Sequence, residues 1–325
     1  MSTLKVFTDI QASAGLLDWL RNEIAPHELL LPAKRAASVL VEQASDPLIA
    51  EADIAFGQPD VASVLNAPRL RWLQVSSAGF TRYDTPGFRK AAKARGLVVT
   101  NSSHVYDQAC AEHVFAFMLA QARQLPRSLK TRCTNSDPAW TMLRESSRLL
   151  LGQSVSIYGY GAIAERLVGM LAPFNMEITA VRRQPRGDEG IRIVTPDQAI
   201  AALGEADHVI NILPDNADSR GFFNETVFRA MKSGSVFYNI GRGTTVDQDA
   251  LADALQHGPI EAAWLDVTDP EPLPEGHRLL GLPNCHITPH VAGGQRGESR
   301  VLVAHFLENF RRHLNDGALL NRVIG

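Results

Sequence analysis

The chain has 325 residues, which is more than one ordinary hydrophobic core holds and enough for two domains. Its formal net charge of −3 excludes a strongly basic nucleic-acid-binding surface, and no apolar run approaches the ~18 residues of a membrane span, so we expect neither nucleic acid nor membrane as a partner. Three widely spaced cysteines without a C-x-x-C pair argue against a disulfide framework and against a metal site. No secretory signal precedes the first predicted strand, and we therefore expect a cytoplasmic protein.

The first hundred residues alternate short apolar runs with helical patterns, such as the one at 14–24. Strands are predicted at 4–8, 53–56, 70–76 and 96–100. This alternation predicts a parallel sheet with helices on both faces. The segment Ser77, Ala78 and Gly79 follows one of these strands, and it either exposes backbone N–H groups to an anion or forms a plain turn.

The rest of the chain begins with a long helical pattern at 105–130 and a polar, irregular stretch at 131–150. A second alternating series follows, with strands predicted at 155–158, 176–181, 207–213, 235–240, 260–267 and 285–288. It ends in a helical pattern at 296–316, by which the chain returns to its first domain. We predict an α/β fold of two Rossmann-like or flavodoxin-like domains with parallel sheets and a cleft between them. The predicted domains are residues 1–101 plus 295–325 for the substrate and residues 102–294 for a dinucleotide.

The dinucleotide is suggested by the sequence Val-Ser-Ile-Tyr-Gly-Tyr-Gly-Ala-Ile-Ala at 155–164. Gly159 and Gly161 interrupt an apolar strand just before a helical pattern. The first glycine allows a tight turn, and the second lets a pyrophosphate approach the backbone at the helix N-terminus. Ala164 takes the third glycine position, where only close packing is needed. A G-x-G-x-x-A pattern by itself also occurs in ordinary turns between a strand and a helix.

Three further segments place reactive side chains at predicted strand ends. Arg242, between two glycines, is either a carboxylate-binding group or a surface arginine. Glu271, in a proline-rich loop, is either held for chemistry or part of a polar turn. His290, in Thr-Pro-His, is a general acid candidate because an imidazole titrates near neutral pH, although a lone histidine is more often structural. Structural roles are expected for His104, His113, His286 and His313.

In this order, these segments resemble the D-2-hydroxyacid dehydrogenase family over nearly the whole chain. The matching residues are Thr100-Asn101, Ala111-Glu112-His113, Leu213-Pro214, Met231-Lys232, Gly241-Arg242-Gly243, Val246-Asp247, Ala250-Leu251, Leu265-Asp266-Val267, Glu271-Pro272 and Thr288-Pro289-His290. The resemblance implies that His290 donates a proton to the substrate carbonyl and that Glu271 is its acidic partner. It implies that Arg242 and the backbone of 77–79 bind the substrate carboxylate, and that Asp266 contacts the nicotinamide amide.

The resemblance also implies a set of cofactor-binding residues. They are Tyr160, Gly161, Ala162, Ile163, Arg182, Arg183, Leu213, Pro214, Ile240, Gly241, Arg242, Asp266, His290, Ala292 and Gly293. An NAD enzyme of this fold carries an acidic residue at the end of the second strand, where this chain has Arg182 followed by Arg183. A guanidinium attracts the 2′-phosphate that a carboxylate would repel, so we expect NADP(H) to be preferred, with NAD(H) as a possible second coenzyme.

The segment 265–274 looks like the glyoxylate/hydroxypyruvate reductases of this family, which implies a small 2-keto acid as substrate and a 2-hydroxy acid as product. Family members dimerise through the region around 105–150, so we expect a homodimer in which Trp140 reaches the partner's substrate site, unless Trp140 packs within its own chain. Two alternatives remain open, a dinucleotide-sensing corepressor and a phosphite or formate dehydrogenase of the same fold. The chain departs from the family pattern at Asn175, where glycine is common, and at Trp264, where a small residue is usual.

Overall fold

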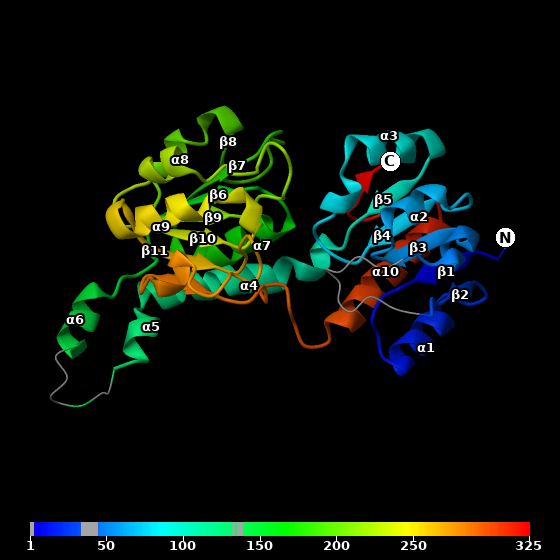
Figure 1. Ribbon diagram of the computed structural model, residues 1–325, viewed down its shortest axis with the longest axis horizontal. Coiled ribbons are helices and arrows are strands. Elements are labelled where there is room, and N and C mark those ends of the chain that lie inside the picture. Colours follow the sequence, from blue (N-terminus) through cyan, green and yellow to red (C-terminus); the bar gives the residue numbers. More distant parts are fainter. Residues whose placement is uncertain (1–2, 34–44, 132–133, 135–138) are drawn as a thin grey trace. The chain divides into compact units, whose positions relative to one another are not determined.

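The computed structural model describes residues 3–33, 45–131, 134 and 139–325. The chain divides into two compact units, residues 1–106 with 294–325, called unit 1, and residues 107–293, called unit 2 (Figure 1). Each unit is built on its own sheet of mostly parallel strands, as predicted for an α/β fold. The division falls a few residues after the predicted boundary at 101, because the first turn of helix α4 (Ser103–Ala122) belongs to unit 1.

Unit 1 contains a six-stranded sheet in the order β13-β5-β4-β3-β1-β2. Its strands are β1 (Lys5–Thr8), β2 (Glu28–Leu30), β3 (Ile54–Gly57), β4 (Trp72–Val75), β5 (Val98–Thr100) and β13 (Arg322–Ile324). The prediction of a purely parallel sheet is wrong at one edge, because β13 pairs antiparallel with β5. An edge strand that returns directly from a preceding helix needs no crossover, so it can pair in either direction.

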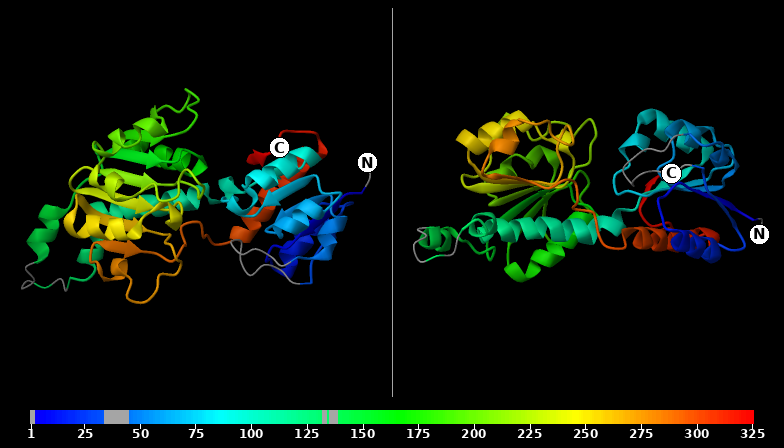
Figure 2. Two further views of the ribbon diagram at one scale, coloured as in Figure 1. Left: turned by 45° about the horizontal axis from the view of Figure 1, so that its top comes forward. Right: turned by 60° about the horizontal axis from the view of Figure 1, so that its bottom comes forward.

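The helices of unit 1 begin and end at local signals. They are α1 (Ala14–Glu23), α2 (Val61–Asn66), α3 (Pro86–Arg95) and α10 (Glu298–Leu314). The hydroxyl of Thr85 caps α3 by accepting from the amide of Phe88, and Gly96 ends the helix in a left-handed conformation. Helices α1 and α10 cover one face of the sheet, and α2 and α3 cover the other (Figure 2).

Unit 2 contains a seven-stranded sheet in the order β12-β11-β10-β9-β6-β7-β8, with every pairing parallel. Its strands are β6 (Ser154–Tyr158), β7 (Glu177–Val181), β8 (Arg192–Val194), β9 (His208–Asn211), β10 (Ser235–Asn239), β11 (Ile260–Leu265) and β12 (Cys285–Ile287). The strand order reverses between β6 and β9, and ligands of open parallel sheets bind at such a switch point. The strands β2, β8 and β13, of three residues each, were not predicted.

The helices of unit 2 correct two predictions. They are the larger part of α4, α5 (Leu125–Ser128), α6 (Ala139–Ser146), α7 (Ala162–Leu171), α8 (Glu225–Arg229) and α9 (Gln248–His257). The helix predicted at 105–130 is interrupted after Ala122, because Gln124 adopts a left-handed φ of 53°. The stretch predicted to be irregular at 131–150 contains α6 in its described part. Two short 3-10 helices lie beside candidate site loops, Thr81–Tyr83 in unit 1 and Gly243–Thr245 in unit 2.

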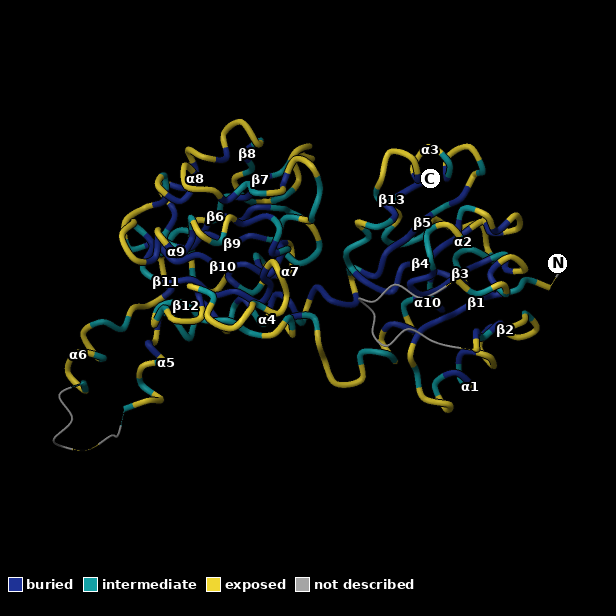
Figure 3. The backbone as a smooth tube through the Cα atoms, in the orientation of Figure 1, coloured by how far each residue is buried: buried dark blue, intermediate teal, exposed yellow. Residues whose placement is uncertain are grey.

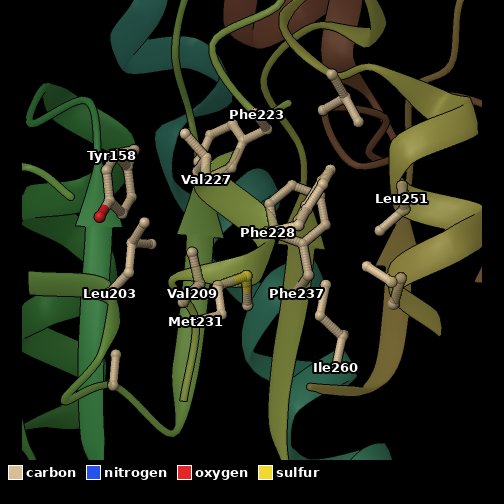
Figure 4. Packing of buried hydrophobic residues seen from close by; sticks show 14 of the residues in the cluster. Tyr158, Leu203, Val209, Phe223, Val227, Phe228, Met231, Phe237, Leu251 and Ile260 are labelled. Carbon is tan, nitrogen blue, oxygen red and sulfur yellow. The ribbon is translucent and has the colours of Figure 1, made fainter. Parts of the chain in front are cut away.

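The cores lie on both faces of the central strands, which are dark in Figure 3. In unit 1, Phe306 of α10 stacks on Phe56 and Trp72 with ring centroids 4.5 and 5.4 Å apart. In unit 2, one face of the sheet packs against α8 and α9 (Figure 4), through residues that include Tyr158, Leu203, Val209, Phe223, Phe228, Phe237, Leu251 and Ile260. Each such side chain contributes about 1.5–3 kcal/mol on burial, which keeps the carboxyl ends of the strands in fixed register.

Among the described residues, no helix is both long and apolar enough to cross a membrane.

Candidate active site

Parallel pairing brings most of the candidate residues of unit 2 to one edge of its sheet. Tyr160 and Gly161 follow β6, Arg182 follows β7, Leu213 and Pro214 follow β9, Ile240 to Arg242 follow β10, Asp266 follows β11 and His290 follows β12. All of these are carboxyl ends of strands, which lie at the same edge of a parallel sheet. The sheet therefore gathers residues that are up to 130 positions apart in the chain.

The glycine turn after β6 has the geometry that its sequence predicts. Gly159 has a φ of +96°, and a Cβ there would lie 2.9 Å from the carbonyl oxygen of Ile212, so only glycine fits. A Cβ on Gly161 would meet nothing within 4 Å, and Gly161 begins α7 without a side-chain cap. The start of α7 at the switch point is therefore uncapped and uncrowded beside Gly161, which suits an anion that accepts hydrogen bonds from the first amides of the helix.

The glycines beside Arg242 have a packing role that the sequence did not reveal. A Cβ on Gly241 would lie 2.7 Å from the carbonyl oxygen of Leu213, and one on Gly243 would lie 2.1 Å from the carbonyl carbon of Thr268. The loops after β9, β10 and β11 therefore approach one another backbone to backbone. Glycine at 241 and 243 is required for this contact.

Two buried asparagines that sequence reasoning missed hold these loops. Asn211 donates to Asn239 Oδ1 at 3.0 Å and to Thr245 Oγ1 at 2.7 Å. Their side-chain oxygens accept the amides of Leu213 and Gly241 at 3.0 and 3.1 Å. Asparagine as the last residue of both β9 and β10 was the available signal, since a polar residue ending an apolar strand needs buried partners.

The candidate acid and its partner are in direct contact. Nδ1 of His290 lies 2.8 Å from Oε1 of Glu271, and the two side chains are 28% and 37% exposed, so both are accessible. A carboxylate at this distance stabilises the protonated imidazole and directs Nδ1–H towards itself, which leaves Nε2 for another partner. His290 has a φ of +52°, a left-handed conformation that is uncommon for a residue other than glycine.

Asp266 is buried, and its carboxylate is used mainly within the chain. Oδ1 accepts from the Thr288 hydroxyl at 2.6 Å and from the Val291 amide at 2.9 Å, and Oδ2 accepts from the Ala292 amide at 2.8 Å. A carboxylate offers about four acceptor positions, of which these bonds use three. They make Asp266 an anchor of the His290 loop, and the contact with nicotinamide that the resemblance implies stays a prediction.

Arg242 is largely enclosed, and Nη1 donates to the Gly241 carbonyl at 2.6 Å. Burial lowers the pKa of Arg242, while the nearby Asp215 and Glu271 carboxylates oppose this shift. A guanidinium keeps its charge in proteins and has five N–H donors, of which this bond uses one. The others suit a bidentate contact with a substrate carboxylate.

The basic residues after β7 are held more loosely. The Arg182 guanidinium lies over the Tyr160 ring at 5.8 Å, Nε donates to the Gln184 carbonyl at 2.9 Å, and Nη1 lies 3.7 Å from Glu189. Nη1 is buried and makes no hydrogen bond to any described residue. Arg183 is exposed and lies 3.6 Å from Asp218. Both guanidinium groups are therefore available to a further anion.

The candidate substrate loop belongs to unit 1 and follows β4. Ser77 Oγ accepts from Gln58 Nε2 at 2.8 Å and donates to the Gly79 carbonyl at 2.5 Å. The Ala78 carbonyl accepts from Asn101 Nδ2 at 2.7 Å. Because its carbonyls are engaged in this way, the loop has a defined shape in which its amides can serve as donors.

The structure shows the surroundings of three residues that are open or unusual in the sequence: Trp140, Trp264 and Asn175. Trp140 lies on α6, is 66% exposed, and has the Arg144 guanidinium over its ring at 5.1 Å. Trp264 on β11 donates to Gln121 Oε1 at 3.0 Å and packs against His286 with ring centroids 4.2 Å apart, which accounts for its size. Asn175 adopts a φ of +47°, the left-handed conformation for which glycine is common.

These features together define a dinucleotide-binding α/β protein with an acid–base pair at the carboxyl edge of its second sheet. The model of the D-isomer specific 2-hydroxyacid dehydrogenase family, NAD binding domain, matches residues 115–292, which is more than half of the chain. The chain therefore belongs to this family.

Named relatives agree with the assignment. The chain is 35% identical over 201 residues to the glyoxylate reductase/hydroxypyruvate reductase of Mus musculus, and the match covers 61% of each protein. It is 29% identical over 319 residues to the glyoxylate reductase of Pyrococcus furiosus, covering 94% of this chain and 89% of that one. The match thus spans about three fifths of the length of the mouse relative and most of the archaeal one.

A solved structure shows the same fold over nearly the whole chain. The NADPH-dependent glyoxylate/hydroxypyruvate reductase of Sinorhizobium meliloti, in complex with NADP and malonate, superposes with a TM-score of 0.73 at 25% identity. The superposition covers 99% of this chain and 97% of that one.

Proposed function

We propose that the protein reduces a small 2-keto acid of the glyoxylate/hydroxypyruvate class to the D-2-hydroxy acid, with a preference for NADPH. The observation that carries the proposal is the 2.8 Å contact between His290 and Glu271 at the sheet edge that also presents Arg242. These side chains supply a proton and a carboxylate-binding group, which are what the reduction of a 2-keto acid requires.

The residues at the switch point fit a nicotinamide dinucleotide. The uncapped start of α7 and the open space beside Gly161 suit its pyrophosphate, and the buried Nη1 of Arg182 lacks a hydrogen-bond partner among the described residues. The loops with Leu213 and Ile240 border the same edge and would hold the nicotinamide half. When bound, this cofactor supplies the hydride.

Substrate binding and proton donation are assigned to side chains of this protein. Arg242 would bind and orient the substrate carboxylate. The amides of residues 77–79 in unit 1 are the further carboxylate donors that the family resemblance implies. Glu271 holds the Nδ1–H of His290 and stabilises the imidazolium, so that a proton is held at Nε2. That proton passes to the carbonyl oxygen of the substrate as the alcohol forms, and His290 is left neutral until solvent reprotonates it.

The preference for NADPH is supported by Arg182 and Arg183, which take the place of the acidic residue that an NAD enzyme uses for the ribose. A charge-assisted hydrogen bond contributes about 1.5–3 kcal/mol where water is excluded. Because these guanidinium groups are partly exposed, we expect NADPH to be favoured about 10- to 1000-fold over NADH in kcat/KM.

We further propose a homodimer in the cytoplasm. Large apolar side chains are exposed on and around α5 and α6: Leu125, Leu129, Trp140, Met142, Leu149 and Leu151. A monomer rarely exposes so many neighbouring apolar side chains without a partner. Light scattering at micromolar concentration should give twice the mass of one chain, and Trp140→Ala should raise the KM of the keto acid if Trp140 reaches the partner's substrate. A monomeric mass would contradict this proposal.

The proposed activity is tested by following NADPH oxidation with glyoxylate, hydroxypyruvate, pyruvate, phenylpyruvate and 2-ketoisocaproate, and then repeating the assays with NADH. We expect the highest kcat/KM with glyoxylate or hydroxypyruvate. Reduction of none of them, with retained dinucleotide binding, would favour a dinucleotide-sensing binding protein. Oxidation of phosphite or formate would favour a dehydrogenase of that type.

A further inference from the structure

A polar cluster lies behind the loop that carries His290, and the proposed reaction does not use it directly. His113 of α4 has Nε2 at 3.2 Å from Thr288 Oγ1 and at 3.6 Å from Asp266 Oδ1. The Asp266 side chain is only 1% exposed, and that of His113 is 22% exposed. Phe117, one helical turn after His113, packs edge-on against its ring at 4.4 Å. The imidazole is therefore confined between α4 and the ends of β11 and β12.

The direction of each hydrogen bond in this cluster follows from its chemistry. The Thr288 hydroxyl has one proton, and it donates that proton to Asp266 Oδ1 at 2.6 Å. The same hydroxyl must then accept from His113, which places a hydrogen on Nε2 of the imidazole. Burial lowers the pKa of His113, although Asp266 opposes the shift, so a neutral imidazole with Nε2–H suits the site. The chain of donors runs from His113 through Thr288 to Asp266.

Asp266 in turn determines the backbone of the His290 loop. Its carbonyl oxygen accepts the His290 amide at 2.9 Å, and its carboxylate accepts the amides of Val291 and Ala292 at 2.9 and 2.8 Å. These bonds hold His290 at a φ of +52°, where a residue with a Cβ is disfavoured by about 1 kcal/mol or more. The position of the ring that meets Glu271 thus depends on the orientation of the Asp266 carboxylate.

We propose that His113 and Thr288 are positioning residues for His290, acting through Asp266. Neither residue touches the reacting atoms in this assignment. Their hydrogen bonds keep the Asp266 carboxylate turned towards the amides of 291 and 292, and so keep the His290 ring beside Glu271. The proposal rests on the proposed function for its effect on turnover, but the position of the His290 ring can be measured without turnover.

Four other charged or titratable groups lie near the cluster. Cys110, one turn before His113 on α4, is buried; burial raises its pKa to about 12, so it stays a neutral thiol. Arg242 faces Cys110 from the loop after β10, and Asp107 faces it from the start of α4. Glu271 faces both His290 and Arg242. The variants below leave all four of these groups in place.

The sharpest test is a pair of substitutions at Thr288. Thr288→Val keeps the shape of the side chain and removes its hydroxyl, whereas Thr288→Ser keeps the hydroxyl and removes a methyl group. We expect Thr288→Val to lower kcat about tenfold or more, since small displacements of a reacting group are costly. Thr288→Ser should stay within about threefold of the wild type, and the Kd for NADPH, measured by fluorescence, should change little in either variant.

A second pair tests the other end of the chain of donors. His113→Leu removes the Nε2–H donor, whereas His113→Gln can still present an N–H group to Thr288. We expect kcat to fall in His113→Leu and to be partly restored in His113→Gln. This pair also keeps the test decisive if Thr288→Val does not fold, which its thermal melting curve will show.

A readout independent of turnover is the Nδ1 resonance of the His290 imidazole at one fixed pH, followed by NMR and assigned with a His290→Gln variant. Loss of the hydrogen bond to Glu271 should shift this resonance in Thr288→Val and His113→Leu, but not in Thr288→Ser. A change in overall stability alone would not produce this pattern. Folded Thr288→Val and His113→Leu proteins with a wild-type resonance and wild-type kcat would overturn the inference. Absence of any turnover in the wild type would overturn the proposed function, while the resonance would still decide the positioning.

Discussion

The candidate site residues of unit 2 lie along the carboxyl edge of its sheet, and the two ends of this edge differ in their hydrogen bonding. At the β11–β12 end, Asp266 is buried and its carboxylate accepts three hydrogen bonds of 2.6 to 2.9 Å. At the β7 end, Arg182 and Arg183 meet carboxylates only at 3.7 and 3.6 Å, and the Arg183 side chain is 73% exposed. The first end is a network of short hydrogen bonds, whereas at the second end the guanidinium groups lie beyond hydrogen-bond distance of these carboxylates.

The difference matches what each end is proposed to do. Proton transfer requires a donor within hydrogen-bond reach of one atom, so a displacement of about 1 Å is costly. Attraction of a phosphate by a guanidinium varies slowly with distance and tolerates several geometries. We therefore expect substitutions at the β11–β12 end to reduce turnover and those at the β7 end to change the choice of coenzyme.

The largest effect is expected at the β11–β12 end. His290→Ala removes the proton donor and should lower kcat/KM for the best keto acid by about 10² or more, with little change in NADPH binding. Steady-state kinetics and coenzyme titration measure both quantities. His257→Ala, at the exposed end of α9, is the matched control and should behave like the wild type. Near-normal reduction by His290→Ala would rule out the assignment.

At the β7 end, Arg182→Asp restores the acidic residue of an NAD enzyme. The carboxylate should repel the 2′-phosphate and accept hydrogen bonds from the ribose, which moves the NADPH/NADH ratio of kcat/KM towards NADH about 10- to 1000-fold. The ratio is measured with one keto acid at constant ionic strength. An equal fall of kcat with both coenzymes would contradict the proposal that the β7 end selects the coenzyme without supporting turnover.

A smaller effect is expected for Glu271→Gln. Glutamine keeps the shape of the side chain but does not stabilise the imidazolium, so we expect about a tenfold loss in kcat at neutral pH. Steady-state kinetics with the best keto acid measure this loss, and Glu275→Gln, in the same loop, is the control that should behave like the wild type. A wild-type kcat in Glu271→Gln would speak against the role of Glu271.

The smallest effect is expected for Arg183→Ala. Because the side chain is exposed and its ion pair with Asp218 is long, we expect less than about a threefold change in KM for NADPH. Arg182→Ala, which removes the more enclosed guanidinium, is the comparison and should change KM more. If Arg182→Ala and Arg183→Ala changed the KM for NADPH equally, the difference in exposure of the two side chains would not explain their contributions to NADPH binding.

Much of this arrangement was predictable because it depends on local patterns. The alternation of apolar runs and helical spacing predicted the α/β class and most of the long strands, since such runs become the buried strands of a parallel sheet. The glycine turn, Arg242, Glu271 and His290 were also singled out, because each is a reactive or turn-forming residue directly after a predicted strand. A parallel sheet brings its strand ends to one edge wherever they lie in the chain.

Other features depend on contacts between distant segments, and only the tertiary structure decided them. His113 was expected to be structural, because nothing near it in sequence shows that α4 places it beside Thr288 and Asp266, more than 150 residues later. The need for glycine at 241 arises from the backbone of the loop after β9, and helix α6 was hidden by its polar flanks. Local sequence determines which elements form and which residues end them, because propensity and capping act over a few residues. Which side chains share a hydrogen bond is decided by packing, because buried polar groups take their partners from whatever the fold brings within about 3 Å.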